Sequence, residues 1–362
     1  MSNVFAAAAE KWNKSRQASK DHKAQVENAL KNKEIRLVDL SFIERNRMSQ
    51  GYLLALKIKK VAIIVARFVL FFGLSFLILQ PILSKISMSF MAEKDLYDST
   101  VINIPAHFTL DNYRVVSELM AYGKCLGGSL FYSAFLAVLQ VAVCTLVGYG
   151  FARFEFPFKK FWFFCVILTI IIPPQTISSA LYLHFNYFDI LGLIKLITGH
   201  TVNLRGSALP YILMSGFCMG LKNGVYIFMT RQYFRNVPRA MEEAAYVDGS
   251  GTLRTFVQVL LPDAKPIITS CFLFAFVWQW TDAYYSKLFL GNADLLSTSL
   301  SGLGDRFNQY MQREHGVIGV GTGYTSAIIS TGTLMVIVPL IILYLFEQRG
   351  FTESLAGTSV KM

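Results

Sequence analysis

The sequence predicts an all-α polytopic membrane protein with six membrane-spanning helices. First, 54% of its 362 residues are hydrophobic, a larger share than an ordinary soluble domain contains. Second, six apolar segments approach or exceed the roughly 20 helical residues that cross a bilayer. Third, only helices and closed barrels satisfy their backbone hydrogen bonds in lipid, and apolar runs of this length form helices.

The first 60 residues form a basic extension ahead of the first apolar segment. They contain 13 Lys and Arg against 6 Asp and Glu. Apolar residues such as Val26, Leu30 and Ile35 recur among the charges and predict partial helix. We expect a solvated cytoplasmic tail that helps to orient the first span; the alternative is an amphipathic helix on anionic lipid or on a partner subunit. The polarity of this extension also argues against a cleavable signal peptide.

Residues 61–362 are predicted to form the membrane domain, and proline and glycine interrupt several of its spans. Pro81 lies near the end of the first span, Pro173-Pro174 lies within the third, and three glycines between positions 216 and 224 punctuate the fourth. Proline bends a helix and glycine allows close helix approach, so these spans either line a cavity or contain ordinary packing kinks. The six predicted spans are Ile63–Leu83, Leu130–Phe151, Phe161–Leu183, Ala208–Met229, Ile267–Leu290 and Val320–Leu345.

The charges between the spans predict the orientation of the chain. Residues 87–126 carry 3 basic and 5 acidic groups, whereas residues 231–265 carry 5 basic and 4 acidic groups. Lys and Arg accumulate on the cytoplasmic side of membrane proteins. Together with the basic extension, this bias predicts that both termini and the 231–265 loop are cytoplasmic, and that residues 87–126 lie outside.

The net charge and the missing motifs narrow the function. A charge of +11 suits nucleic-acid binding, but cytoplasmic segments of membrane proteins also collect Lys and Arg, so we expect membrane lipid and no nucleic acid as partners. The five cysteines form no C-x-x-C pair and the five histidines are far apart, which predicts no disulfide framework and no metal site. No nucleotide-binding G-x-x-x-x-G-K-[ST] loop or other catalytic signature occurs. We therefore expect a transport subunit without catalytic residues or a cofactor, rather than an enzyme.

The segment from Arg231 to Pro266 is polar, lies between two apolar spans and begins as a helix. Pro238 suits the first helical turn. Glu242 and Glu243 follow near the positive end of this helix. Ala244 and Ala245 add a smooth face that fits a shallow cleft. The pattern predicts a short helix that lies across the cytoplasmic face.

A turn and a second helix follow in the same segment. Asp248-Gly249 breaks the first helix because glycine accepts the backbone angles of a tight turn. Thr252–Leu260 is then predicted as the second helix, which Leu261-Pro262 ends. The apolar face of this helix contains Leu253, Phe256, Val257 and Leu260. A soluble partner could push or pull such a helix-turn-helix as a rigid body.

This segment resembles the EAA loop of permease subunits from bacterial ABC importers. Their pattern is Glu-Ala-Ala, three residues, Gly, nine residues and Ile-x-Leu-Pro. Here it reads Glu243-Ala244-Ala245, Gly249 and Val259-x-Leu261-Pro262, with Val in place of Ile. The resemblance runs from about residue 60 to the end. Further stretches similar to carbohydrate-uptake permeases are Phe108–Tyr113, Tyr149–Phe154, Arg231–Pro238 and Trp278–Asp282.

The resemblance implies the type I ABC importer permease fold in a bacterial cytoplasmic membrane. It implies a heterodimer with a second, homologous permease subunit, two ATPase subunits docked on the EAA loops, and an extracytoplasmic sugar-binding protein. ATP and magnesium would bind in the ATPase subunits, whose closure drives alternating access. The residues that it assigns to ATPase docking are Glu242, Glu243, Ala244, Ala245, Asp248, Gly249, Leu261 and Pro262.

Polar and aromatic residues inside two predicted spans are candidates for the substrate pathway, because such groups are costly in lipid. Lys222-Asn223 lies in the fourth span, and either faces the path or marks a helix break in which Lys222 bonds to carbonyls. Trp278, Trp280 and Asp282 in the fifth span offer stacking faces and a carboxylate, which suit sugar rings and hydroxyls. Trp278 and Asp282 would share a helix face. Alternatively, Asp282 pairs with Lys222.

The predicted function is the permease subunit of a binding-protein-dependent importer for a sugar, and specifically an oligosaccharide. One alternative is a non-sugar solute in the same importer class, against which the Phe108–Tyr113 signature argues. A second is an ion-coupled carrier, which should show paired inverted repeats that this sequence lacks. A third is a membrane-embedded enzyme, against which the missing catalytic cluster argues.

Overall fold

The protein is described by a computed structural model that covers residues 52–359 except Ser99, Asn103, Asn292 and Ile318, together with a few positions between 17 and 46. This described part is helical, with two isolated β-bridges. The helices are α3 (Tyr52–Ser89), α4 (Glu93–Tyr97), α5 (Asp111–Leu119), α6 (Tyr122–Arg153), α7 (Lys159–Ile171), α8 (Pro174–Asn186), α9 (Leu193–Thr198), α10 (Leu209–Gly216), α11 (Asn223–Asn236), α12 (Ala240–Val247), α13 (Thr252–Thr255), the π-helix η1 (Phe256–Leu260), α14 (Leu261–Asp263), α15 (Lys265–Thr281), the π-helix η2 (Ser286–Leu290), α16 (Leu296–Ser301), α17 (Leu303–His315) and α18 (Thr322–Ser359).

The chain divides into two units, residues up to Ile82 and residues from Leu83 onward. The main element of the first unit is α3, which continues through Pro81. Its side chains are apolar around the whole circumference and exposed, among them Phe68, Phe71 and Leu77. A helix that is apolar on every side suits a lipid environment. Most of the basic extension, with its predicted partial helix, lies outside the described residues.

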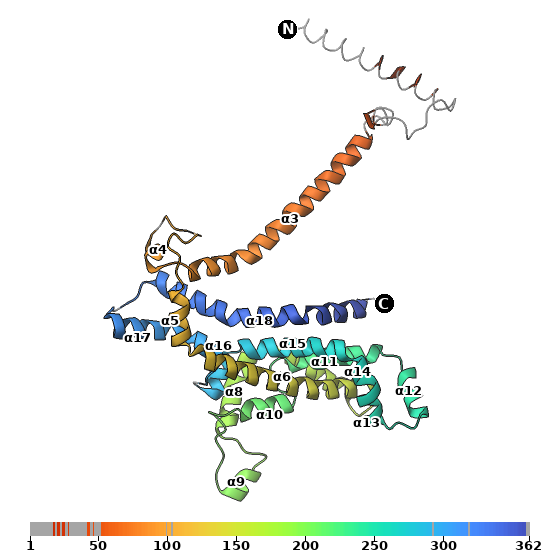
Figure 1. The fold of residues 1–362 in the computed structure, drawn as a ribbon. Coiled ribbons are helices and arrows are strands. Elements are labelled where there is room, and N and C mark those ends of the chain that lie inside the picture. The colour runs from red at the N-terminus through yellow and green to blue at the C-terminus, as the bar shows by residue number, and fades with distance from the viewer. Residues whose placement is uncertain are drawn as a thin grey trace. The chain divides into compact units, whose positions relative to one another are not determined.

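The second unit is a bundle organised around α6. This helix packs against α10, α11 and α15, and α15 also packs against α18 (Figure 1). Gly148 lets α11 approach α6, because a Cβ atom there would overlap Thr230 and lie 2.9 Å from the backbone nitrogen of Arg231. Cys144 and Cys271 fill the centre as small buried residues, and all five cysteines of the chain are free thiols.

The described residues contain three helices that are long and apolar enough to cross a membrane: Leu54–Ser89, Tyr122–Arg153 and Thr322–Gln348. Two bent pairs qualify if each pair counts as one span. They are Lys159–Ile171 with Pro174–Asn186, bent by 103°, and Thr252–Asp263 with Lys265–Thr281, bent by 77°. The total is therefore three to five. The predicted six spans and the cytoplasmic placement of both termini stay predictions.

The third and fourth predicted spans are not continuous helices. Pro173-Pro174 separates α7 from α8, because proline cannot donate the helical hydrogen bond and restricts the residue before it. The fourth predicted span, Ala208–Met229, is divided into α10 and α11 by a break at residues 217–222. Cys218 and Lys222 in this break adopt left-handed backbone angles, with φ of 60° and 61°. The interruptions predicted at Pro173-Pro174 and at the glycines near position 220 are thus complete breaks rather than kinks, whereas α3 continues through Pro81.

The fifth and last spans also differ from their predicted bounds. The fifth helix, α15, ends at Thr281 instead of continuing to Leu290, and the π-helix η2 begins only at Ser286. The last helix, α18, extends past the predicted end at Leu345. Apolar composition continues across both boundaries, so hydropathy alone did not locate them.

Residues 87–126, predicted as an outer loop, are largely folded. Met91 and Phe108 form a β-bridge, and the ring of Phe90 stacks on that of Phe108 with centres 4.8 Å apart. The side-chain amide of Asn112 donates hydrogen bonds to the carbonyl oxygens of Ser89 and Met91 at 3.0 and 2.9 Å. The Phe108–Tyr113 signature therefore shapes the turn that follows α3.

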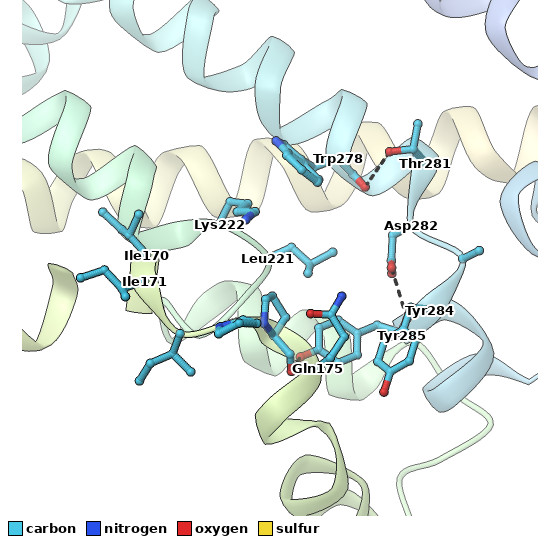
Figure 2. Close-up of a pocket in the computed structure, with 14 residues that line it drawn as sticks. Ile170, Ile171, Gln175, Leu221, Lys222, Trp278, Thr281, Asp282, Tyr284 and Tyr285 are labelled. Atoms are coloured by element: carbon cyan, nitrogen blue, oxygen red, sulfur yellow. Dashed lines mark hydrogen bonds between the residues drawn. The ribbon is translucent and has the colours of Figure 1, made fainter. Parts of the chain in front are cut away.

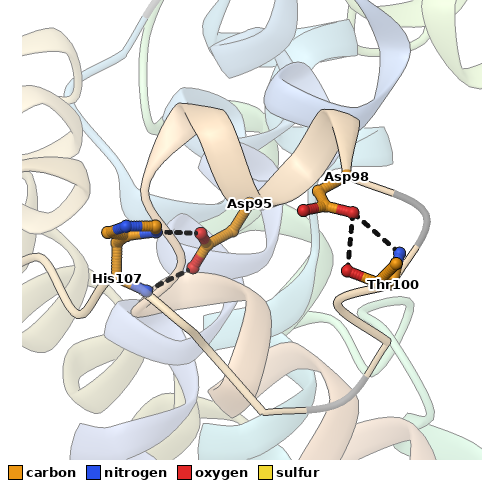
Figure 3. Close-up of polar contacts among 4 residues, drawn as sticks. All are labelled: Asp95, Asp98, Thr100 and His107. Atoms are coloured by element: carbon orange, nitrogen blue, oxygen red, sulfur yellow. Dashed lines mark hydrogen bonds and ion pairs between the residues drawn. The ribbon is translucent and has the colours of Figure 1, made fainter.

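Two carboxylates stabilise the same segment (Figure 3). Asp95 is buried and accepts hydrogen bonds from the backbone N–H of His107 at 2.7 Å and from its imidazole at 2.6 Å. Asp98 accepts from the backbone N–H and the hydroxyl of Thr100. The N–H of His107, followed by its side chain, lowers the pKa of Asp95 below the usual value. These four hydrogen bonds brace the loop between α4 and α5.

Candidate functional site

The predicted helix-turn-helix is present, as α12 followed by α13, η1 and α14. Gly249 has a φ of 80° and lies in the turn. The N–H of Gly249 bonds to the carbonyl of Tyr246 at 3.0 Å, and the N–H of Ser250 bonds to that of Ala245 at 2.9 Å. These two bonds are the Schellman arrangement that ends a helix at a left-handed glycine. Glycine at this position therefore sets the angle between the two arms of the hairpin.

A buried ion pair connects the hairpin to the end of α6. The Nε atom of Arg153 lies 2.5 Å from a carboxylate oxygen of Glu242, and both side chains are buried. Arg153 also donates to the carbonyl oxygen of Val237 at 2.7 Å. Glu242 was assigned to ATPase docking, but its carboxylate is turned into the protein. The two adjacent glutamates lie on different sides of α12, since successive helical residues point in different directions.

The remaining predicted docking residues are divided between surface and interior. Ala245 is buried, and Leu261 is half-buried. Glu243, Ala244, Asp248, Gly249 and Pro262 are exposed. Val247 and Leu253, on the two arms, are 87% and 74% exposed. The predicted apolar face of the second arm is thus split, because Phe256 and Leu260 are buried whereas Leu253 and Val257 are exposed.

We call the exposed residues Glu243, Ala244, Val247 and Leu253 the hairpin face. Val247 was missed from the sequence because it lies outside the Glu-Ala-Ala pattern. Figure 1 shows α12 and α13 at one end of the second unit, and α8 and α16 at the other. The hairpin face combines small and apolar side chains with one carboxylate, a composition that can seat in a shallow cleft of another protein.

A second contact holds the far arm of the hairpin. The hydroxyl of Tyr233, on α11, donates to Asp263 at the end of α14, with oxygen–oxygen distances of 2.6 Å to its carbonyl and 2.8 Å to its carboxylate. Burial and then the neighbouring carboxylate raise the pKa of Tyr233, which keeps the phenol protonated and able to donate. The hairpin is therefore fastened at both ends, by Arg153 and by Tyr233.

A cavity of about 500 Å³ brings three of the predicted pathway residues together (Figure 2). Lys222, Trp278 and Asp282 all line it. The Nζ atom of Lys222 lies 4.9 Å from the centre of a Trp278 ring, within cation–π distance. The lining comes from three segments: the α7–α8 bend, the break before α11, and the end of α15. The other polar or aromatic lining residues are Gln175, Thr281, Tyr284 and Tyr285.

Asp282 is held by the backbone that follows it and by a tyrosine on α10. Its carboxylate accepts from the backbone N–H groups of Tyr285 and Ser286, both at 3.2 Å, and from the hydroxyl of Tyr211. Because α15 ends at Thr281, Asp282 lies just outside the helix and does not share a helix face with Trp278 as predicted. Both residues nevertheless line the same cavity. Within the described residues, Asp282 forms no ion pair with Lys222.

Asn223 and Trp280, the other two predicted pathway residues, do not line this cavity. Trp280 is buried in the core, stacks on Phe276 and donates from its indole N–H to the carbonyl oxygen of Val336 at 3.1 Å. Asn223 is buried beside Gln140. Trp278 and Trp280 are two positions apart, so a helix points them in different directions and only one can face the cavity.

The wall opposite Trp278 was missed from the sequence. The hydroxyl of Tyr285 donates to the carbonyl oxygen of Pro174 at 2.7 Å, and that of Tyr284 donates to the hydroxyl of Ser178 at 2.9 Å. These bonds join the end of α15 to the start of α8. The sequence signal that could have located this wall is Pro173-Pro174, because irregular backbone at membrane depth is tolerated where it lines a cavity.

Comparisons with known proteins cover both the hairpin and the cavity. A family model described as "Binding-protein-dependent transport system inner membrane component" matches residues 119–350. The chain is 26% identical over 291 residues to the arabinooligosaccharides transport system permease protein AraQ of Halalkalibacterium halodurans, which spans 80% of this chain and 93% of that protein. It is 24% identical over 288 residues to the maltodextrin transport system permease protein MdxG of Bacillus subtilis, spanning 80% and 92%.

A solved structure shares the fold. It is described as the crystal structure of a bacterial ABC transporter involved in the import of the acidic polysaccharide alginate. One of its chains superposes with a TM-score of 0.57 over 80% of this chain and 97% of that chain, at 18% sequence identity.

Proposed function

This chain belongs to the family of binding-protein-dependent transport system inner membrane components, and from that premise we propose that it is the permease subunit of an ATP-driven sugar importer. The proposed location is the bacterial cytoplasmic membrane, with several spans crossing the bilayer. The proposed partners are a second, homologous permease subunit, two ATPase subunits and an extracytoplasmic sugar-binding protein. ATP and magnesium are proposed to bind in the ATPase subunits.

The hairpin face is the single observation that carries the proposal. It presents exposed apolar and acidic residues from two arms whose angle is fixed by Gly249. Arg153 and Tyr233 fasten these arms to α6 and α11. A partner that moves the hairpin therefore moves the bundle as well. This arrangement supports docking of an ATPase subunit whose closure drives alternating access.

The cavity supports a sugar as the solute. Trp278, Tyr284 and Tyr285 provide aromatic surface, against which the apolar face of a pyranose ring can stack. Lys222 and Gln175 supply donors for hydroxyl groups, and small polar ligands are oriented by a few such groups in a concave site. The matched relatives named for arabinooligosaccharides and maltodextrin favour an oligosaccharide.

Copurification tests the docking proposal. We expect Glu243→Lys to abolish recovery of the ATPase subunits with the permease, because the new charge lies on the hairpin face. Glu118→Lys is the matched control, since Glu118 is an exposed glutamate on α5 with a single exposed ion-pair partner, Arg114. Both variants should reach the membrane in normal amounts. Normal recovery of the ATPase with Glu243→Lys would contradict docking at this face.

Uptake by the complete complex tests the solute class. Arabinooligosaccharides and maltooligosaccharides are compared with an amino acid and with inorganic phosphate, each with its ATP dependence measured. We expect ATP-dependent accumulation of an oligosaccharide that falls at least about tenfold with Trp278→Ala, the effect of losing an aromatic platform at a fully formed site. Accumulation of the amino acid or of phosphate alone would instead favour the non-sugar alternative.

A further inference from the structure

Gln140 connects the two segments that carry Lys222 and Trp278. It lies on α6, is fully buried and does not line the cavity. Its Nε2 atom donates to the carbonyl oxygen of Leu221 at 3.2 Å and to the side-chain oxygen of Asn223 at 2.7 Å. These two acceptors flank Lys222 on either side. One amide group thus holds both neighbours of the cavity lysine.

The other end of the same side chain reaches α15. The Oε1 atom of Gln140 accepts a hydrogen bond from Nε2 of Gln279 at 3.2 Å. Gln279 directly follows Trp278 in the sequence. Gln140 therefore links the break before α11 to the end of α15, and the two linked segments supply the Lys222–Trp278 pair of the cavity wall.

The backbone of the break needs such support. Lys222 and Cys218 have φ angles of 61° and 60°, which residues with a Cβ adopt at an energetic cost unless surrounding contacts enforce them. Gly220 lies between them, and a Cβ atom there would be 2.5 Å from Nε2 of Gln140. The break is thus fitted closely around the glutamine amide.

The alternative is that the amide cluster only stabilises the bundle. Among the described residues, however, the Nδ2 atom of Asn223 and the Oε1 atom of Gln279 are buried without a hydrogen-bond partner. A partly satisfied buried network stabilises less than apolar packing of the same volume. The cluster is therefore better suited to fixing geometry than to adding stability.

We propose that Gln140 is a positioning residue that fixes Lys222 against Trp278 and thereby sets the affinity of the cavity for the transported solute. The statement about affinity rests on the proposed uptake function. The statement about geometry does not, because it concerns the position of Lys222 in the protein without any solute.

The first test measures the position of residue 222 directly. Cys165 and Cys218, the two cysteines that are not buried, are replaced by serine, and Lys222→Cys supplies a thiol in the cavity. Its rate of reaction with a soluble maleimide is measured in the full complex with and without Gln140→Leu. We expect a rate change of at least about fivefold, since thiol reactivity follows exposure and surroundings.

Thr331→Val is the matched control. Thr331 is a fully buried polar residue whose hydroxyl bonds within its own helix, to the carbonyl oxygen of Ala327. It should leave the maleimide rate at position 222 unchanged. An unchanged rate in the Gln140→Leu variant would overturn the positioning role, and so would an equal change with Thr331→Val.

The second test is a double-mutant cycle on uptake by the complete complex. Gln140→Leu should raise the apparent KM for the transported oligosaccharide about fivefold or more with a smaller change in kcat. In the Lys222→Ala background the same substitution should change KM by less than about twofold, because the group it positions is gone. A purely structural effect would be additive in the two backgrounds, and that result would overturn the proposal.

The two tests separate this proposal from the proposed function. A maleimide shift in a complex that accumulates no sugar would refute sugar uptake and leave the positioning intact. Normal sugar uptake with unchanged labelling and unchanged KM would refute the positioning alone.

Discussion

At the scale of single residues, two adjacent glutamates in α12 have different surroundings. Glu242 forms the buried pair with Arg153, and Glu243 stays exposed on the hairpin face. The sequence predicted that both lie near the start of a helix, and this was correct. The sequence did not predict which of the two carboxylates is buried. That depends on the position of Arg153 at the end of α6 relative to α12.

Removing one member of this pair should destabilise the hairpin. Arg153→Met leaves the Glu242 carboxylate buried and unpaired, which costs about 3–5 kcal/mol when a buried pair is broken. We expect faster proteolysis between α12 and α13 in the membrane-embedded protein, and restoration by the double variant Arg153→Met/Glu242→Leu. Glu155→Gln is the control, because the Glu155–Lys159 pair is largely exposed at the glutamate and such pairs contribute less than about 1 kcal/mol. Equal protease sensitivity of both single variants would contradict the role of the buried pair.

Asp95 should make the segment between α4 and α5 sensitive to acid. Its pKa is lowered in the folded protein, first by the backbone N–H of His107. A carboxyl with a lowered pKa stabilises the fold above its unfolded value of about 3.9, and this contribution is lost as the pH falls through the lower folded value. The protection of residues 92–107 against hydrogen exchange, taken relative to the intrinsic exchange rate at each pH, should therefore fall below about pH 4. Asp95→Asn should remove this acid step, and an identical step in that variant would show that another group causes it.

At the scale of helices, apolar composition and the positions of proline and glycine predicted most of the helices and two of their interruptions. Long apolar runs predicted α3, α6 and α18, and Pro173-Pro174 and the glycines near 220 predicted where two other spans are interrupted. The fourth span was predicted as one helix because its apolar residues continue across the break. Only tertiary contacts, such as those of Gln140 with Leu221 and Asn223, fix the left-handed residues there.

The turn of the hairpin should depend on glycine at one position and not at its neighbour. Gly249 has a φ of 80°, whereas Gly251 has a φ of −76°. Neither position has an atom within 4 Å of an added Cβ. Gly249→Ala should cost about 1–2 kcal/mol through backbone strain alone and reduce ATP-dependent uptake, and Gly249→Pro should abolish uptake. Gly251→Ala should transport normally. Normal uptake by Gly249→Pro would show that the turn geometry is not needed.

At the scale of the whole molecule, the sequence predicted the family, and the two candidate regions that it named stay predictions as functional sites. Lys222, Trp278 and Asp282 meet in one cavity as candidates, whereas Asn223 and Trp280 belong to the core. The α8 side of the cavity could not be predicted, because it depends on the 103° bend between two helices that hydropathy merges into one.

The complete assembly should be required for transport. Purified permease reconstituted alone in vesicles should not accumulate an oligosaccharide, because the proposed function places ATP binding in the partner ATPase subunits. Vesicles that also contain the second permease, the ATPase subunits and the binding protein should accumulate it when ATP and magnesium are supplied. The partners without this chain serve as the control. Accumulation by the chain alone would contradict the division of labour proposed above.

The second arm of the hairpin continues directly into α15, which contributes Trp278 to the cavity wall. The chain bends by 77° between the two. The 17 residues of α15 form a helix about 25 Å long, at a rise of about 1.5 Å per residue. Under the proposed function, an ATPase subunit that moves the arm from Thr252 to Asp263 would tilt α15 and shift Trp278 near its other end. A tilt of about 10° would carry the far end of α15 through about 4 Å, given a length of about 25 Å. A small movement of the hairpin would then be enlarged at the wall of the cavity that contains Trp278.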